Sequence, residues 1–305
     1  MPERDGYIPG VPCWVDVSEP DPETARDFYG GLFGWEFEET MPPGSADSYL
    51  IATCQSRAWS LFDMSGEPRS GMVAAVRSIP EGAPPAALWN TYVWVDSADA
   101  AASKVREAGG DVAIEPYDAA SAGRMALFTD PERAAFWVLE ARNHRGATLV
   151  NDPGSLNFNG LNTRDADGAK AFYGAVFGWE TFVMDGGVEM FTLPGYGNFV
   201  ESHHPGLRER WAKAGAQQGF EDVVATINPI SDDQPDTPPH WSATFGVEDT
   251  DAAAAKTEEL GGQVIVPPFD APWTRTTVIA DPQGATLIVS RFTPDNKDLT
   301  VPQLP

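Results

Sequence analysis

The stretch "FYGGLFGW", residues 28–35, decides how this sequence is interpreted, because it returns as "FYGAVFGW" at residues 172–179. Six of the eight positions are identical, and an aspartate precedes each copy at the same distance, Asp21 in one case and Asp165 in the other. A phrase that recurs so far along a chain is the signature of a duplicated structural unit. Each copy is therefore expected at the same place in a repeated fold.

The repetition extends well beyond this phrase. "VDSADAAASKVREAGGDVAIEPYDA" (95–119) matches "VEDTDAAAAKTEELGGQVIVPPFDA" (247–271), and "TDPERAAFWV" (129–138) matches "ADPQGATLIV" (280–289). We predict two homologous halves, residues 8–145 and 153–293, followed by an extended tail over 294–305. Residues 197–219 have no equally long counterpart in the first half. Because loops of this length are usually functional or disordered, the segment is expected to be a lid with a short helix over 205–214.

Each half shows one plan twice. "CWVDVS" (13–18) alternates as a half-buried strand does, and a helix follows over 21–34. Asp21 is a suitable N-cap for this helix, and Gly34 supplies the left-handed residue that ends it. Three apolar strand segments come next, and the plan restarts at "WNTYVWVDS" (89–97). The pattern predicts an α+β fold of four βαβββ modules.

Composition excludes several classes of partner. The chain has 45 acidic and 20 basic residues, a net charge of −25 that repels nucleic acids and anionic membranes. Its start has no apolar signal core, and no run approaches the ~20 apolar residues of a membrane span. Two cysteines, Cys13 and Cys54, are too few for a disulfide framework and are expected to be inert core thiols. We expect a cytoplasmic protein, monomeric or homodimeric.

Taken together, these features resemble the vicinal oxygen chelate superfamily, which contains glyoxalases, bleomycin-resistance proteins and extradiol dioxygenases. The resemblance rests on "A-x-x-FY-x-x-x-FGW" in the first helix, a second helix that ends in Gly-Gly, and "DP-x-G" before the last strand. It is closest to two-domain members often labelled glyoxalase-like antigens or hydroxylases. It implies two tandem glyoxalase-like domains, in which paired modules curl into a cup around a ligand.

The resemblance also implies where a metal would bind in members that use one. Their ligands, usually His and Glu, lie in the first strand of each module and near the last strand. In this sequence those positions hold Trp14, Asn90, Trp137, Phe158, Ser242 and Ile288. None of these side chains is a His, Glu, Asp or Cys donor for a divalent metal. No metal and no other cofactor is therefore expected.

Strand alternation predicts which side chains face each cup, because neighbouring residues point to opposite sides of a sheet. In the first half, the inward residues are Trp14, Asp16, Asn90, Tyr92, Trp94, Trp137 and Leu139. In the second half, they are Phe158, Gly160, Asn162, Ser242, Thr244, Thr286, Ile288 and Ser290. Apolar walls with a few polar groups suit a flat organic ligand, so the expected partner is a small aromatic molecule.

Roles follow from residue chemistry. Asp16 and Tyr92 are the predicted catalytic residues, since a carboxylate among aromatic rings can have a raised pKa and act as a general base. The predicted substrate-binding residues are Trp14, Asn90, Trp94, Arg124, Trp137, Phe158, Asn162, Ser242, Thr244 and Arg275. Arg124 and Arg275 stand six residues before each "DP" and suit an anionic or enolic oxygen. Alternatively, the tryptophans fill a closed core, an arginine makes Asp16 structural, and Arg124 and Arg275 only fix a loop.

Three functions remain open. The first is a metal-independent tailoring enzyme that isomerises, cyclises, hydrates or eliminates on an aromatic or polyketide-like metabolite. The second is a non-catalytic protein that sequesters an aromatic antibiotic, as bleomycin-resistance relatives do. The third is metal-dependent dioxygenase or glyoxalase chemistry through Glu189, Glu201, His203 and His204. Adjacent histidines on a loop are more typical of a surface, and His240 is typical of a rim hydrogen-bonding residue.

Overall fold

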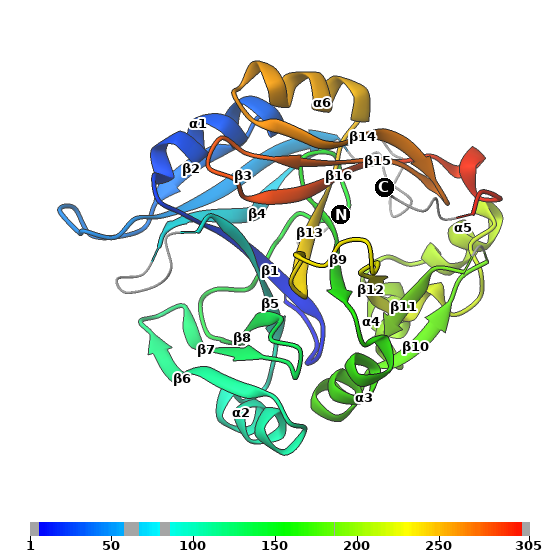
Figure 1. Ribbon diagram of the computed structural model, residues 1–305, viewed down its shortest axis with the longest axis horizontal. Coiled ribbons are helices and arrows are strands. Elements are labelled where there is room, and N and C mark those ends of the chain that lie inside the picture. The colour runs from blue at the N-terminus through cyan, green and yellow to red at the C-terminus, as the bar shows by residue number, and fades with distance from the viewer. Residues whose placement is uncertain (1–5, 58–66, 80–85, 186, 301–305) are drawn as a thin grey trace. The chain divides into compact units, whose positions relative to one another are not determined.

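The computed structural model describes residues 6–57, 67–79, 86–185 and 187–300. The predicted fold class is confirmed, because the chain is an α+β arrangement of four βαβββ modules (Figure 1). Module 1 contains β1 (Pro12–Glu19), α1 (Pro22–Phe33), β2 (Glu36–Glu39), β3 (Tyr49–Arg57) and β4 (Pro68–Ser78). Module 2 contains β5 (Leu88–Trp94), α2 (Ala98–Glu107), β6 (Asp111–Ala119), β7 (Gly123–Thr129) and β8 (Ala135–Ala141).

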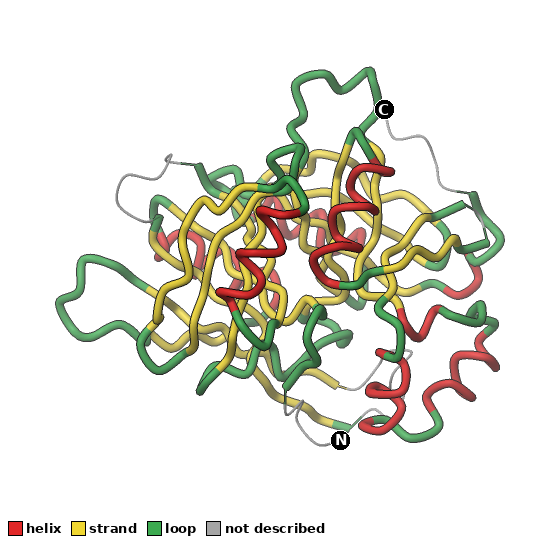
Figure 2. The backbone as a smooth tube through the Cα atoms, turned by 90° about the horizontal axis from the view of Figure 1, so that it is seen from below, coloured by secondary structure: helices red, strands yellow, loops and turns green. Residues whose placement is uncertain are grey.

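The second half repeats the plan with additions. Module 3 contains β9 (Leu156–Thr163), α3 (Ala166–Phe177), β10 (Glu180–Val183), β11 (Glu189–Thr192), α4 (Tyr196–His203), α5 (Leu207–Ala214), the short helix η1 (Phe220–Asp222) and β12 (Val223–Pro229). Module 4 contains β13 (His240–Gly246), α6 (Thr250–Glu259), β14 (Gln263–Ala271), β15 (Thr274–Ala280), β16 (Thr286–Phe292) and the short helix η2 (Pro294–Asn296). Figure 2 distinguishes these helices from the strands by colour.

The strand order is the same in every module. The orders are β2-β3-β4-β1, β5-β8-β7-β6, β10-β11-β12-β9 and β13-β16-β15-β14. The first strand of each module is parallel to its last strand, as the β1–β4, β5–β8, β9–β12 and β13–β16 pairings show. This register places Asp16 opposite Ala75 and Tyr92 opposite Trp137. Each first strand, which carries predicted site residues, thus has a fixed partner within its own module.

Helix α1 begins and ends at the predicted residues. The Asp21 carboxylate accepts from the backbone N–H groups of Glu23 and Thr24, and Gly34 has a φ of 71°. Helix α3 repeats this arrangement with Asp165 at its start and Gly178 at a φ of 75°. Both ends are stabilised because the cap satisfies free amides and glycine adopts the left-handed conformation without a Cβ clash.

Residue contacts divide the chain into two compact units that differ from the two sequence halves. Unit 1 comprises Met1–Trp14, Thr91–Gly146 and Phe158–Ser242, and unit 2 comprises Val15–Asn90, Ala147–Asn157 and Ala243–Pro305. Unit 1 therefore combines modules 2 and 3, and unit 2 combines modules 1 and 4. Within the units, α2 packs beside α3 and α1 beside α6, as the blue and orange helices of Figure 1 show. The predicted domains, 8–145 and 153–293, follow the duplication rather than these units.

The repeated phrase supplies the aromatic core of each unit. In unit 2, the centroid of the Tyr29 ring lies 5.7 Å from that of Trp35 and 5.3 Å from that of Trp89. In unit 1, Tyr173 lies 5.4 Å from Trp179 and has a second tryptophan neighbour, Trp241, at 5.5 Å. Aromatic pairs at these separations contribute beyond the area they bury. The phrase thus recurs because each unit needs the same aromatic centre.

Each core tyrosine also has a buried polar partner from the "DP" motif. The Tyr29 hydroxyl donates to Asp281 Oδ2 at 2.8 Å and accepts from Trp89 Nε1 at 3.2 Å. Tyr173 donates to Asp130 Oδ2 at 3.1 Å in the same way. A buried hydroxyl needs such partners, because an unpaired one would lose its bonds to water without replacement. Two motifs far apart in the sequence therefore meet in each unit.

The Gly-Gly pairs that end α2 and α6 have a steric reason. Gly109 and Gly261 have positive φ values of 90° and 84°. A Cβ on Gly110 would lie 2.5 Å from the Thr129 carbonyl oxygen, and one on Gly262 would lie 2.6 Å from the carbonyl oxygen of Ala280. The first glycine permits the turn and the second permits close approach to a strand.

The insertion and the tail differ in part from expectation. The helix expected over 205–214 is present as α5, and α4 precedes it. The tail is not wholly extended: residues 294–296 form η2, where Asn296 Nδ2 donates to Asp270 Oδ1 at 3.2 Å and to the carbonyl of Thr274 at 3.1 Å. Residues 301–305 of the predicted tail lie outside the described residues. Over the part of the chain that is described, no helix combines the length and apolarity needed to span a membrane.

Candidate functional site

A polar cluster surrounds Asp16 in unit 2. We call Asp16, Ser18, Tyr49, Arg77 and Asn90 the Asp16 cluster. The Asp16 side chain has no solvent exposure. Its Oδ1 accepts from Asn90 Nδ2 at 2.8 Å, and its Oδ2 accepts from the Tyr49 hydroxyl at 3.4 Å. Arg77 Nη1 lies 3.9 Å from Oδ2, and Asn90 also donates to Ser18 Oγ at 3.0 Å. The Asp16 carboxylate thus has two neutral hydrogen-bond donors, Asn90 and Tyr49, and one cationic neighbour, Arg77.

Alternation along β1 explains why this cluster forms on one face. Val15 and Val17 are fully buried in the core that contains Phe28 of α1. Since successive side chains point to opposite faces, Asp16 and Ser18 face away from that helix. The cation nearest to Asp16 among the described ion pairs is Arg77 of β4, which the sequence analysis did not consider. Tyr49, on β3, was also missed, because strand pairing rather than sequence distance brings it near.

The aromatic residues predicted for the first cup form pairs within unit 1. The rings of Tyr92 and Trp137 are stacked with centroids 5.6 Å apart and an interplanar angle of 17°. Trp94 lies 6.0 Å from Tyr7. Trp14 is 1% exposed, and its ring centroid lies 4.5 Å from that of His144 with the two ring planes nearly perpendicular. These contacts describe a packed aromatic layer.

His144 was not singled out from the sequence, since it lies in the connection between the halves. Its Nδ1 accepts from the backbone N–H of Gly146 at 3.0 Å, which places the proton on Nε2. That Nε2 is buried, and no described residue is its hydrogen-bond partner. Burial lowers the pKa of His144 to about 4, so the ring is neutral at physiological pH. A neutral histidine beside Trp14 is a further candidate donor to a ligand.

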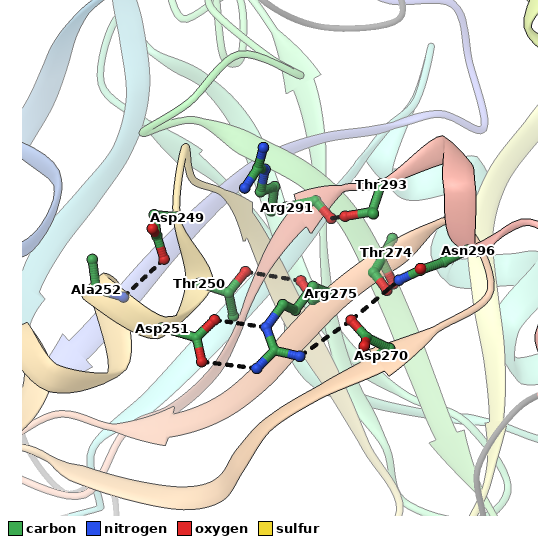
Figure 3. A network of polar contacts seen from close by, with 10 residues as sticks. All are labelled: Asp249, Thr250, Asp251, Ala252, Asp270, Thr274, Arg275, Arg291, Thr293 and Asn296. Carbon is green, nitrogen blue, oxygen red and sulfur yellow. Dashed lines mark hydrogen bonds and ion pairs between the residues drawn. The ribbon is translucent and has the colours of Figure 1, made fainter.

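Arg124 and Arg275 make equivalent ion pairs within their own modules. Arg275 Nε and Nη2 donate to Asp251 at 2.6 and 2.8 Å, and Nη1 donates to Asp270 at 3.1 Å (Figure 3). Arg124 donates to Asp99 at 2.8 and 3.1 Å. Both carboxylates, Asp99 and Asp251, belong to the first turn of a helix. These contacts match the alternative in which each arginine fixes a loop.

Residues predicted for the second cup are divided between the units. In unit 1, Asn162 Nδ2 donates to Ser242 Oγ at 3.1 Å, and that hydroxyl donates to the Gly160 carbonyl at 3.2 Å. Phe158 lies 6.5 Å from Phe220, the first residue of η1. In unit 2, Thr244 lies opposite Ile288 in the parallel β13–β16 pair.

The two glutamates proposed for metal chemistry, Glu189 and Glu201, are engaged in other contacts. Glu201 caps α5, because its oxygens accept from the N–H groups of Gly206 and Arg208 at 2.6 and 2.9 Å. Glu189 forms an ion pair with Lys170 at 2.7 Å. Nowhere in the described residues do three His, Cys, Asp or Glu side chains gather as possible metal ligands. The residues present do not fit the metal that members of this fold family can use, and no chemical step is derived through one.

A groove of about 940 Å³ lies elsewhere in unit 2. It is lined by residues of α1, β3, β4 and α6, including Phe33, Cys54, Arg69 and Lys256. None of the predicted site residues lines it. Because Phe33 packs against the core beneath α1, this groove lies on the helix side of module 1. The candidate site remains the Asp16 cluster.

Comparison with known proteins identifies the class. The family model for the Glyoxalase/Bleomycin resistance protein/Dioxygenase superfamily matches residues 14–138 and again 155–289. The chain therefore belongs to this superfamily, and the resemblance seen in the sequence is confirmed.

Individual relatives cover nearly the whole chain. "Putative glyoxylase CFP32" of Mycobacterium tuberculosis is 37% identical over 96% of this chain and 99% of its own length. "Anthracycline biosynthesis protein DnrV" of Streptomyces peucetius is 33% identical over 92% of both chains. Among solved structures, the 2,3-dioxygenase LapB from Pseudomonas sp. KL28 matches with a TM-score of 0.55 at 14% identity, covering 97% of this chain and 98% of its own. That last likeness shows the fold alone.

Proposed function

We propose that this protein is a metal-independent tailoring enzyme that moves a proton on an aromatic or polyketide-like metabolite, with Asp16 as the acid/base. The observation that carries the proposal is the fully buried Asp16 carboxylate, hydrogen-bonded to Asn90 and Tyr49. A relative with 33% identity is named for anthracycline biosynthesis, which supports an aromatic polyketide as the substrate class. Membership of the superfamily supports a small-molecule ligand.

The cluster suits proton transfer for an electrostatic reason. Burial removes water from a carboxylate and so disfavours its charged form, which makes a buried carboxylate a stronger base toward a bound substrate. Asn90 orients Asp16 through Oδ1, and the Tyr49 hydroxyl orients Oδ2. Asp16 accepts a proton from an acidic C–H or O–H of the substrate and returns it to another atom. Returned to another atom of the same substrate, the proton completes an isomerisation or a cyclisation. Hydration also takes up a water molecule, and elimination also releases a leaving group, with Asp16 moving the proton in each case.

The predicted ligand-binding tryptophans Trp14 and Trp137 and the predicted second acid, Tyr92, belong to unit 1, whereas Asp16 belongs to unit 2. The proposal for the Asp16 cluster therefore rests on the residues of unit 2 alone. A sequestering protein would bind the same ligand without proton transfer. The hydrogen bonds that Asp16 accepts from Asn90 and Tyr49 also suit a purely structural carboxylate. The two functions therefore differ in what the carboxylate does.

An exchange experiment tests the proposal. Wild-type protein and Asp16→Asn are incubated with aromatic polyketide ketones in D₂O, and mass spectrometry follows deuterium incorporation and product formation. We expect both to fall by at least 100-fold in the variant, since general base catalysis typically contributes about 10²–10⁴-fold. Binding, followed by tryptophan fluorescence, should change little because asparagine is isosteric.

The control for disturbance of strand β1 is Glu19→Gln on its opposite face, where glutamine replaces a carboxyl whose raised pKa keeps it protonated in the folded protein. It should retain exchange and turnover. Exchange that is unchanged in Asp16→Asn would show that Asp16 is not the base. Wild-type exchange no faster than in protein-free solution, with binding intact, would favour sequestration over catalysis. Loss of exchange in both variants would show that strand β1, rather than the Asp16 carboxylate, was disturbed.

A further inference from the structure

The two halves differ chemically at the positions equivalent to Asp16 and its neighbours. By the sequence repeat, Gly160 stands where Asp16 does, and Ser242 stands where Asn90 does. Thr226 and Asn228 lie on β12, opposite Gly160 and Asn162 of β9. The five residues of the second half, Gly160, Asn162, Thr226, Asn228 and Ser242, all belong to unit 1. A carboxylate centre in one half therefore corresponds to a set of neutral groups in the other.

Polar atoms converge over Gly160. A Cβ built on this glycine would lie 2.6 Å from Asn228 Nδ2, 2.6 Å from Thr226 Oγ1 and 3.2 Å from Ser242 Oγ. Real Cβ atoms do not approach other atoms within 3.0 Å, so the space above Gly160 is already shared by these three groups. The absence of a side chain on Gly160 is what permits them to meet.

Two of the three groups have no hydrogen-bond partner among the residues that the structure describes. Ser242 Oγ is engaged, because it donates to the Gly160 carbonyl and accepts from Asn162. By contrast, the side chains of Thr226 and Asn228 hydrogen-bond to no described residue, and both are partly exposed. Asn162 Nδ2 donates both to Ser242 Oγ and to the His240 carbonyl, the latter at 3.2 Å. These two hydrogen bonds allow Asn162 to position Ser242. Thr226 and Asn228 are left to bind an external group.

An aromatic wall stands beside these groups. Phe158 precedes Gly160 by two residues on β9 and therefore shares its face of the strand. Its ring lies 6.5 Å from Phe220, which in turn lies 5.5 Å from Trp211 of α5. Phe220 and Trp211 come from or directly follow the inserted segment 197–219. The insertion thus adds aromatic surface next to the polar groups over Gly160.

We infer that Thr226 and Asn228, over Gly160, form a second ligand site that takes the carbonyl oxygen of a neutral aromatic ketone. The Asn228 amide and the Thr226 hydroxyl donate to that oxygen, while Phe158 and Phe220 contact the ring. A neutral oxygen is preferred over a carboxylate because the three groups nearest to the Gly160 position, from Asn228, Thr226 and Ser242, are all neutral. An anion would lose its hydration there without gaining an opposite charge.

Calorimetry with three probes of one shape tests the ligand chemistry. The probes are 2-acetylnaphthalene, 2-ethylnaphthalene and 2-naphthoate, which present a ketone, no oxygen and an anion respectively. We expect wild-type protein to bind the ketone three- to tenfold more tightly than the hydrocarbon, the range of one hydrogen bond, and the anion most weakly. Equal affinity for ketone and hydrocarbon, tighter binding of the anion, or no binding of the ketone would each overturn the inference.

Variants locate the site. Thr226→Val and Asn228→Leu should each lower ketone affinity three- to tenfold and leave hydrocarbon affinity unchanged, while Thr226→Ser should restore ketone affinity. Gly160→Ala should weaken both ligands, because it fills the space. Thr181→Val, an exposed threonine of β10, is the control. Ketone affinity that is insensitive to both Thr226→Val and Asn228→Leu would refute the assignment. Binding is read without turnover, so failure of the Asp16 chemistry would not affect the result.

Discussion

Glu19 offers the sharpest test of the energetics of this fold. It lies on β1, its side chain is fully buried, and neither carboxylate oxygen has a hydrogen-bond donor among the described residues. Its neighbour is Asp281, which accepts from Tyr29 and from three backbone N–H groups of the "DP" turn, at Gln283, Gly284 and Ala285. Two ionised carboxylates cannot bond to each other, whereas a protonated Glu19 donates to Asp281. Burial first, and then Asp281, raise the pKa of Glu19 far above its ordinary value of 4.5.

The sign of the effect on stability follows from linkage. The folded protein keeps a proton on Glu19 that the unfolded chain releases near pH 4.5, so the free energy of unfolding falls as pH rises above that value. The slope is about 1.4 kcal/mol per pH unit while only the folded form is protonated. Between pH 5 and pH 7, Glu19 therefore lowers stability by up to about 3 kcal/mol. Glu19→Gln keeps the shape and a donor to Asp281 but loses this pH dependence.

Urea unfolding at pH 5, 6 and 7 measures the effect. We expect the difference in unfolding free energy between Glu19→Gln and wild type to grow with pH, by up to about 3 kcal/mol at pH 7. Glu23→Gln, which neutralises an exposed acid in the first turn of α1, should show no such growth. Parallel pH profiles of the unfolding free energy for wild type and Glu19→Gln would refute a protonated Glu19 that donates to Asp281. A Gln variant that is less stable than wild type at pH 7 would refute it as well.

Three further outcomes are expected. Gly110→Ala should destabilise the protein by at least about 1–3 kcal/mol in urea unfolding, because the new Cβ meets the Thr129 carbonyl, whereas Ser103→Ala on the same module should not. Asp21→Ala should lower the unfolding free energy by about 1 kcal/mol through loss of the α1 N-cap, again measured with urea. Burial raises the pKa of Cys54 to about 11, so iodoacetamide at pH 8 should modify it slowly in folded protein and fully after denaturation, as mass spectrometry would show.

Much of the fold could be predicted from the sequence, because the repeated motifs mark equivalent elements in each half. Asp21 and Gly34 marked the ends of α1 through capping chemistry that acts within a few residues. Alternation placed Val15 and Val17 on the core face of β1. Such local rules apply wherever hydrogen bonding and steric limits involve neighbours in the chain.

The site was less predictable, since its contacts join strands that are distant in sequence. Tyr49 and Arg77 reach Asp16 only through the β3–β4–β1 order, which alternation along one strand does not reveal. The opposing side chains over Gly160 are set by the β9–β12 register. Arg124 was predicted to bind substrate or to fix a loop from its position before "DP", and the ion pair with Asp99, in the first turn of α2, matches the second of these roles. Sequence spacing alone does not show whether an arginine is paired with a carboxylate of its own chain or is available to a substrate.

The division of the chain into units also bears on how such a protein can be cut or assembled. Each compact unit takes one module from each half. A polypeptide ending near residue 146 would carry Tyr29 without Asp281, and Asp130 without Tyr173. Such a fragment would have to form its aromatic centre between Tyr29 and Asp130, the equivalent of Asp281, either within one copy or between two copies. The full chain instead supplies both partners of each centre from different halves, so the peptide that joins the halves fixes which modules associate.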